Sequence, residues 1–456
     1  MSAIILLSVL GVVLLYLGLG RNKALLAPVA ILGVAGAAAL MLFDQRPLPD
    51  WAGGAMLFDP LSVQFCVAMA GITLLLFVLG ADYYKRTEEN VAEHYALMVF
   101  SLVGAFLLTS YQDLLMLFLG IEVLSIPLYI LAGAKKRSYR SSEAGFKYFL
   151  LGSFATAFFL MGIALVYGMA GSFDLSVIGA YAAENAEQAP VLFLIGLFFI
   201  ALGLAFKVAA VPFHFWSPDV YEGAPTLITA FMSTVVKTAG FAAVYRLIGV
   251  HITALPPQVE RTLWVITGLT LLVGNVVALR QSHFKRLMAY SSVAHTGFLL
   301  LAVLSRNGAS GHAIFYYTLT YALASVGLFV LFTAAKRAAN GDEHIRVFRG
   351  LFKQDPWLGA AALIMLLSLA GIPPTAGFMA KYQVFVLAVQ SGYVWVTLFA
   401  AVMAVMGIYY YLGIIRETFT TNEAPARIEL GAANGAVIAL CAIGALLLGV
   451  WPMGLI

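Results

Sequence analysis

Charged residues are scarce in this sequence. Only 11% of its 456 residues are Asp, Glu, Lys or Arg, and 62% are hydrophobic. A soluble chain would have about a quarter of its residues charged. Apolar runs of about twenty residues, long enough to cross a bilayer core of about 30 Å as a helix, recur along the chain. The sequence therefore predicts an all-α integral membrane protein that crosses the bilayer many times.

Cysteine is almost absent as well. Cys66 and Cys441 lie in separate apolar runs without C-x-x-C spacing, which argues against an iron–sulfur or zinc site held by cysteine. We find neither a G-x-G-x-x-G motif after a strand pattern nor a G-x-x-x-x-G-K-[ST] motif. We therefore expect no cofactor or metal in this chain, and we expect an ion gradient or a partner protein to supply its energy.

The alternation of apolar runs and polar breaks predicts about fourteen spans in one domain over residues 1–456. The N-terminus lacks the cationic segment of a cleaved signal peptide, so we expect the first span to be kept with the N-terminus outside. Eighteen Lys and Arg residues then fall in inside loops, against four outside, namely Arg46, Arg246, Arg261 and Arg306. This asymmetry predicts that both termini lie outside. The long outside connection at 172–189 is expected to form an amphipathic surface helix.

Six ionisable residues remain inside apolar runs: Glu122, Lys147, Lys207, Lys237, His295 and Lys381. A charge at the bilayer centre costs about 3 kcal/mol or more, so such residues face a bundle interior or water. The basic residues other than histidine are all lysines, and a buried lysine can release its proton, whereas arginine stays charged. The set therefore predicts a proton relay.

Each of these residues also has a structural interpretation. Lys147 follows the inside-loop Arg140 by two turns and can extend its ammonium group to the membrane surface. Glu122 can serve only as the partner of one lysine, and His295 can be a packing residue.

Two spans contain helix breakers. Pro212 follows Lys207 in the seventh span, and Pro373 and Pro374 precede Lys381 in the twelfth. Interrupted spans at corresponding positions are typical of transporters with internal repeats. We predict two inverted five-helix repeats, spans 4–8 (91–250) and 9–13 (259–418), with spans 7 and 12 broken and Glu122 matching His295. Three N-terminal spans (1–82) and a last span (429–456) flank them.

The residues around these breaks resemble a known family. One segment is similar to the antiporter-like, proton-translocating subunits of respiratory complex I, and among them its sequence is most similar to the N type. The segment is Val211-Pro212-Phe213-His214-Phe215-Trp216-Ser217-Pro218-Asp219-Val220-Tyr221-Glu222-Gly223-Ala224-Pro225. Leu369 to Lys381, Ser291 to His295 and Gly145 to Phe149 match as well. The likeness extends over essentially the whole chain.

The resemblance implies roles for the six residues. Glu122 and Lys207 would form the acid–lysine pair of a first half-channel, Lys237 with Lys147 beside it would lead to the centre, and His295 would continue to Lys381 as the terminal residue. The implied partners are other complex I membrane subunits (an antiporter-like M type and small K and A/J types), lipid, protons and water, with no nucleic acid. NADH, flavin, iron–sulfur clusters and quinone would bind in partner subunits.

The implied location is the bacterial inner membrane, with both termini on the periplasmic side. Three alternatives stay open: a subunit of a multi-subunit cation/proton antiporter, the equivalent subunit of a membrane hydrogenase or ferredoxin-driven complex, and a scaffold in which the lysines only pack.

Overall fold

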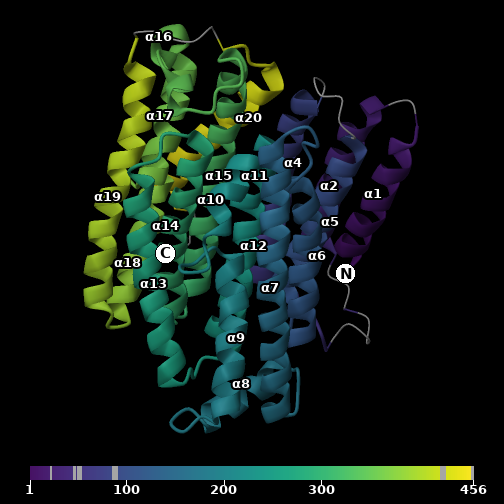
Figure 1. Ribbon diagram of the computed structural model, residues 1–456, viewed down its shortest axis with the longest axis vertical. Coiled ribbons are helices and arrows are strands. Elements are labelled where there is room, and N and C mark those ends of the chain that lie inside the picture. The colour runs from purple at the N-terminus through teal and green to yellow at the C-terminus, as the bar shows by residue number, and fades with distance from the viewer. Residues whose placement is uncertain (21–22, 45–47, 49–53, 85–90, 422–427, 453–456) are drawn as a thin grey trace.

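The computed structural model describes residues 1–20, 23–44, 48, 54–84, 91–421 and 428–452. Over these residues the protein is a bundle of long helices that run roughly along its longest axis (Figure 1). The loop residues Arg21, Arg46, Lys85, Arg86 and Arg427, which contribute to the predicted charge asymmetry, lie outside the described residues.

Eleven helices in the described ranges are long and apolar enough to span a membrane, and three apolar helices are shorter: Ser2–Gly18, Val191–Lys207 and Pro356–Ala370. The all-helical membrane architecture predicted from the sequence is therefore confirmed. The elements are, in chain order, α1 (Ser2–Gly18), η1 (Lys23–Leu25), α2 (Leu26–Phe43), α4 (Pro60–Tyr83), α5 (Val91–Ser110), α6 (Leu114–Ala132), α7 (Tyr139–Ala170), α8 (Leu175–Glu184), α9 (Val191–Lys207), α10 (Trp216–Gly223), α11 (Thr226–Phe231), η3 (Met232–Val236), α12 (Lys237–Tyr245), η4 (Arg246–His251), α13 (Pro257–Ala278), α14 (Phe284–Ser305), α15 (Ser310–Ala338), η5 (Ile345–Phe348), α16 (Leu351–Gln354), α17 (Pro356–Ala370), α18 (Ala376–Gln390), α19 (Val394–Phe419) and α20 (Ala432–Val450).

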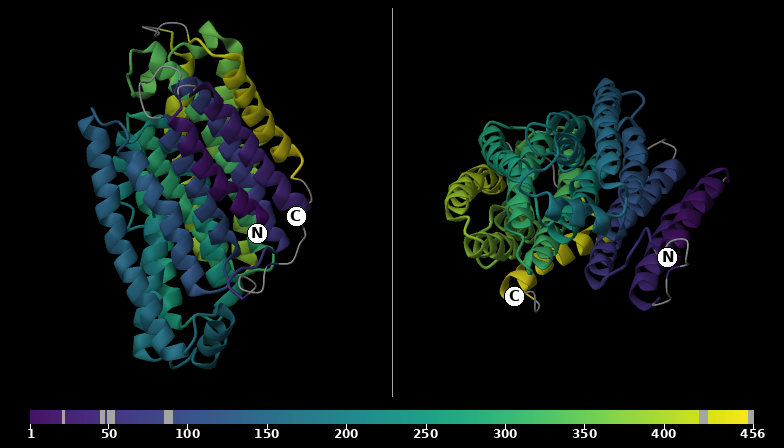
Figure 2. Two further views of the ribbon diagram at one scale, coloured as in Figure 1. Left: turned by 90° about the vertical axis from the view of Figure 1, so that its right-hand side faces the viewer. Right: turned by 90° about the horizontal axis from the view of Figure 1, so that it is seen from below.

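Burial separates central helices from outer ones. The most apolar stretch of Thr226–His251 is 100% buried and that of α14 94%, whereas the stretch in Lys23–Phe43 is only 28% buried. Seen end-on, α1 and α2 lie at one edge of the molecule and α19 at the opposite edge (Figure 2). The outer helices expose leucine, valine and phenylalanine side chains, as a lipid-facing surface requires.

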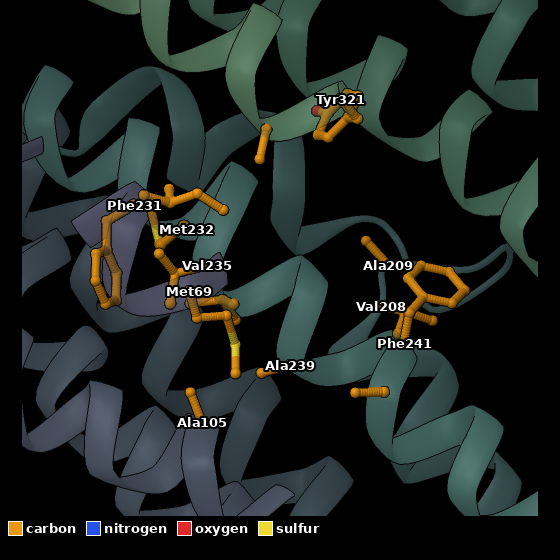
Figure 3. Packing of buried hydrophobic residues seen from close by; sticks show 14 of the residues in the cluster. Met69, Ala105, Val208, Ala209, Phe231, Met232, Val235, Ala239, Phe241 and Tyr321 are labelled. Atoms are coloured by element: carbon orange, nitrogen blue, oxygen red, sulfur yellow. The ribbon is translucent and has the colours of Figure 1, made fainter. Parts of the chain in front are cut away.

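The central span from Thr226 to His251 packs into the apolar core on all sides. Figure 3 shows Phe231, Met232 and Val235 of this span close to Met69 of α4, all members of one buried hydrophobic cluster. The span contains two π-helical turns, η3 and η4. A π-turn widens the helix locally and is frequent at functional sites.

The two predicted helix breaks are present. α9 ends at Lys207 and the chain becomes helical again at Trp216 in α10, with Pro212 between them. α17 ends at Ala370 and α18 begins at Ala376, with Pro373 and Pro374 between them. The predicted surface helix is α8, which buries Leu175, Ile178 and Ala182 on one side.

The same backbone contact occurs twice at a separation of 170 residues. Asp113 bridges to Asp174, where Leu114 N donates to Phe173 O at 3.0 Å. His283 bridges to His344, where Phe284 N donates to Glu343 O at 2.9 Å. The first contact precedes α8 and the second precedes α16, and these helices lie at opposite ends of the bundle (Figure 1).

A close helix approach recurs with the same separation. A Cβ added at Gly104 of α5 would lie 2.2 Å from the backbone nitrogen of Leu124 in α6. A Cβ added at Gly274 of α13 would lie 2.4 Å from that of Ala294 in α14. Glycine at these two positions lets the backbones of each helix pair touch.

Candidate functional site

Lys207 is the last residue of α9 and is buried, with 6% of its surface exposed. Its Nζ donates to Ser125 Oγ at 2.8 Å. Glu122, one turn earlier on α6, accepts instead from Thr156 Oγ1 of α7 at 2.8 Å. Among the described side chains no ion pair joins Glu122 to Lys207. The two members of the expected acid–lysine pair therefore each bind a different hydroxyl group instead of each other.

A small cavity lies beside Lys207. Its volume is about 10 Å³, and the residues with polar side chains in its lining are Ser125, Tyr129, Thr156 and Lys207. That volume is at the lower limit for a single water molecule. Thr156 and Lys207 both line this cavity, and Thr156 donates to Glu122, so the residue that binds the acid and the lysine border the same small space.

The break after Lys207 is held by side chains from the neighbouring helices. Thr296 Oγ1 donates to Val208 O at 2.7 Å, and Val211 N donates to Thr270 Oγ1 at 2.9 Å. Trp216 Nε1 donates to Phe206 O at 3.0 Å. Backbone groups freed at membrane depth need such partners. The break is thus a built feature that fixes the position of Lys207.

Lys237 follows directly after the π-helical turn η3 and is 5% exposed. Its Nζ donates to both the backbone oxygen and Oγ of Ser292 on α14. The ring of Tyr321 from α15 lies 5.6 Å from the same nitrogen, within cation–π range. Lys237 is therefore held at the contact of three central helices.

His295 lies one turn beyond Ser292 on α14 and is buried. Its Nδ1 is 2.8 Å from Tyr317 Oη, and its Nε2 is 3.2 Å from Tyr411 Oη. Tyr411 Oη also shares a hydrogen bond with Ser291 Oγ. Both ring nitrogens have hydroxyl partners, so the imidazole can accept a proton at one nitrogen and release one from the other.

Lys381 lies on α18, after the second break, and is 6% exposed. Its Nζ donates to Ala370 O at 2.7 Å and to Leu369 O at 3.2 Å, which are C-terminal carbonyl groups of α17. A cation is favourable at this end of a helix. Gly371 has a φ of 81°, and a Cβ there would lie 2.7 Å from Lys381 Cδ, so glycine makes room for the lysine.

Lys147 differs from the other three lysines. It forms ion pairs with Glu143 and with Asp219 of α10, each at 2.7 Å, and 38% of its side chain is exposed. Its partners are carboxylates, whereas Lys237 contacts Ser292 and Tyr321. The contacts of Lys147 therefore do not place it beside Lys237, as the resemblance implied. The structural interpretation, a lysine at the polar end of its helix, fits them better.

Lys147 belongs to a charged group around α10. Arg286 Nη1 of α14 donates to Asp219 and Glu222, each at 2.9 Å. Beside it, the buried Lys285 pairs with Glu343 at 3.1 Å. Burial alone would raise the pKa of Glu343, but the ammonium groups of Lys285 and Lys336 outweigh this and hold the pKa below its usual value.

Several hydroxyl groups of the site were not anticipated from the sequence. Ser291 and Ser292 had a signal, because they precede His295 by about one helical turn and so share its face. Ser125 had the same signal, because it follows Glu122 by one turn on α6. The remaining hydroxyl groups had none, because no residue of the predicted relay lies within one turn of them in the sequence: Thr156, Tyr317, Tyr321 and Tyr411. Within the described residues, no group of three His, Cys, Asp or Glu side chains is arranged to hold a metal ion.

Comparison with known proteins identifies the family. The profile described as NADH:quinone oxidoreductase/Mrp antiporter, transmembrane, matches residues 111–407. The chain belongs to this family. NADH-quinone oxidoreductase subunit N of Cytophaga hutchinsonii is 39% identical over 427 residues, which cover 93% of this chain and 91% of that protein. Subunit N of Moorella thermoacetica is 38% identical over 460 residues, 98% and 94% of the two chains.

Solved structures share the fold. A chain of respiratory complex I from Thermus thermophilus with bound aureothin has a TM-score of 0.80 and 35% identity, and the match covers 99% of this chain and 97% of that one. A chain of the Mrp complex from Dietzia sp. DQ12-45-1b has a TM-score of 0.79 at 21% identity, covering 98% and 94%. The second likeness concerns the fold alone.

Proposed function

We propose that this chain is a proton-translocating membrane subunit of an NADH-quinone oxidoreductase. One observation carries the proposal: three buried lysines and a buried histidine have hydroxyl or carbonyl partners and are placed on the central and broken helices. Relatives named subunit N at 38–39% identity over most of the chain favour this function over that of a cation/proton antiporter subunit.

In the proposed relay, Lys207 and Glu122 serve the first half-channel. Lys237 connects to the centre through Ser292, His295 continues between Tyr317 and Tyr411, and Lys381 ends the second half-channel. Hydroxyl groups suit such a path because each can accept one hydrogen bond and donate another. Lys147 is at most peripheral, since its ion pairs with two carboxylates favour a permanently charged ammonium group.

We further propose fourteen spans in two inverted repeats, over 91–250 and 259–418, with 1–82 and 429–456 flanking them. The eleven long helices and the three shorter apolar helices would together make the fourteen spans. The contacts repeated at a separation of 170 residues support these repeats. That register places Ser292, rather than the expected His295, opposite Glu122, and it places His295 opposite Ser125.

The chain itself is proposed to be non-redox. NADH, flavin, iron–sulfur clusters and quinone would then bind in partner subunits, which we expect to include antiporter-like M-type and small K- and A/J-type proteins. The location would be the bacterial inner membrane with both termini on the periplasmic side.

Replacing Lys207 with alanine in the assembled enzyme tests the function. We expect NADH-driven proton translocation into membrane vesicles to fall by about tenfold or more, because a positioned proton-transfer group contributes at least that much to rate. Lys23→Ala, at a lysine in η1 far from the relay in sequence, is the control and should pump normally. Normal pumping by a fully assembled Lys207→Ala enzyme would overturn the relay.

A further inference from the structure

The short helix α10 connects the two halves of the site. It follows the break after Lys207 and is attached to the first half by Trp216. The Trp216 ring stacks on Tyr148 of α7, with centroids 4.6 Å apart and planes 11° apart. Its Nε1 donates to the carbonyl of Phe206, the residue before Lys207. A shift of α10 would therefore also move the C-terminal end of α9, which carries Lys207.

The opposite side of α10 is attached to α14. Arg286 bridges Asp219 and Glu222, with 2.9 Å to each carboxylate. Lys285 donates to the carbonyl groups of Glu222 and Ala224 at the C-terminal end of α10, where a cation compensates free carbonyls. Two consecutive cations of α14 thus bind one turn of α10.

The same helix α14 carries the second half of the site. Ser292, the partner of Lys237, follows Lys285 by seven residues, and His295 follows three residues later. These spacings place the three side chains on one face of α14. The helix that binds α10 at one end therefore also positions Lys237 and His295 further along.

Arg286 is the residue of α14 that binds the side chains of α10, whereas Lys285 binds its backbone. Each acid that it binds has a second cationic partner on α7: Lys147 lies 2.7 Å from Asp219, and Arg140 lies 3.9 Å from Glu222. Loss of Arg286 would thus leave α10 attached to α7 but remove a side-chain bridge to α14. A planar guanidinium can bind both acids at once, which a single ammonium does less well.

We propose that Arg286 is a positioning residue that couples the Lys207 half of the relay to the Lys237–His295 half through α10. It touches none of the relay lysines and moves no proton itself. Its positive charge holds α10, and with it the break after Lys207, in a fixed position relative to α14. This inference rests on the proposed function, because coupling has a consequence only if protons pass through both halves.

The test is proton translocation per NADH oxidised, measured in vesicles that contain the assembled enzyme. Arg286→Gln is expected to lower this ratio severalfold, and Arg286→Lys is expected to lie between Arg286→Gln and the unaltered enzyme. The matched control is Arg306→Gln, which removes a comparable ion pair, 2.8 Å from Glu260, at the outer connections. It should leave the ratio unchanged.

A second measurement separates positioning from general destabilisation. Hydrogen exchange of the amides in 216–223 should be faster in Arg286→Gln, whereas exchange in α5 and α6 should not change. If Lys207→Ala abolishes pumping but Arg286→Gln pumps normally, the coupling role is wrong and the relay stands. If Lys207→Ala also pumps normally, the proposed function itself fails. A global rise in exchange would show a merely structural role and overturn the inference.

Discussion

At the scale of single residues, the partner of each lysine decides what it can do. Lys207, Lys237 and Lys381 donate to neutral oxygens, so loss of a proton leaves no unpaired carboxylate behind. Lys147 has two carboxylate partners, and these stabilise its charged form. The sequence identified all four because lysine is costly in lipid. It set Lys147 apart only as a lysine that can extend its ammonium group to the membrane surface, and left its role open.

Lys381 offers a test of proton exchange. Lys381→His should retain more proton translocation than Lys381→Arg, because imidazole can release a proton near neutral pH and guanidinium cannot. Both substitutions are compared by pumping at equal amounts of assembled enzyme. Equal rates would argue against proton transfer at this position.

The same arginine substitution at Lys147 serves as the control for that comparison. Lys147→Arg keeps a cation between Glu143 and Asp219, so we expect it to pump at nearly the normal rate. A severe loss there would mean that Lys147 also exchanges protons, and that its ion pairs open during turnover.

The hydroxyl partners show why the residue-level prediction was incomplete. Serine, threonine and tyrosine are common in membrane helices, because their hydroxyl groups can bond within the helix or at the interface. Nothing near Tyr317 or Tyr411 in the sequence marks them as partners of His295. Only the packing of α14 against α15 and α19 brings these rings to the imidazole.

At the scale of helices, the breaks were predictable and their support was not. Proline removes a backbone donor and interrupts the helix, so Pro212 and Pro373 marked both sites in advance. The groups that satisfy the freed backbone, Thr296 and Thr270, come from α14 and α13. No spacing rule connects them to the break, because the contact depends on tertiary packing.

The close approach of α13 and α14 predicts a specific sensitivity. Gly274→Ala would put a methyl group 2.4 Å from the Ala294 nitrogen, so the helices must separate. We expect a loss of about 1–3 kcal/mol in stability, the usual effect of overpacking. The thermal denaturation temperature of the purified enzyme would measure it.

The control lies on the same helix. A Cβ at Gly268 would meet no atom within 4 Å, so Gly268→Ala should be neutral or slightly stabilising, since alanine favours a helix. Equal stability of Gly274→Ala and Gly268→Ala would contradict the close packing of α13 on α14 and weaken the argument for repeats.

At the scale of the whole molecule, two ion pairs each join two connections that the sequence predicts on the same side of the membrane. Arg246, one of the four cations predicted outside, pairs at 2.8 Å with Asp59, which follows the second predicted span and so falls on the same side. Arg349 pairs with Glu417 at 2.6 Å, and these residues follow the eleventh and thirteenth predicted spans, both of which end inside when the N-terminus is outside. The positive-inside rule could predict this sorting because it counts charges in every loop, so a missed span would have mixed the two sets. It could not predict which loops touch.

Which end of the bundle faces the periplasm can be tested with single cysteines. The two native cysteines are buried, so introduced ones provide the signal. Lys136 and Gln188 are exposed and lie before and after α7, hence on opposite sides of one crossing. In intact cells a membrane-impermeant maleimide should label Gln188→Cys and should reach Lys136→Cys only after the membrane is opened. The reverse result would invert the protein in the membrane. Labelling of both in intact cells would mean that α7 does not cross, and the arrangement of fourteen spans in two inverted repeats would fail with it.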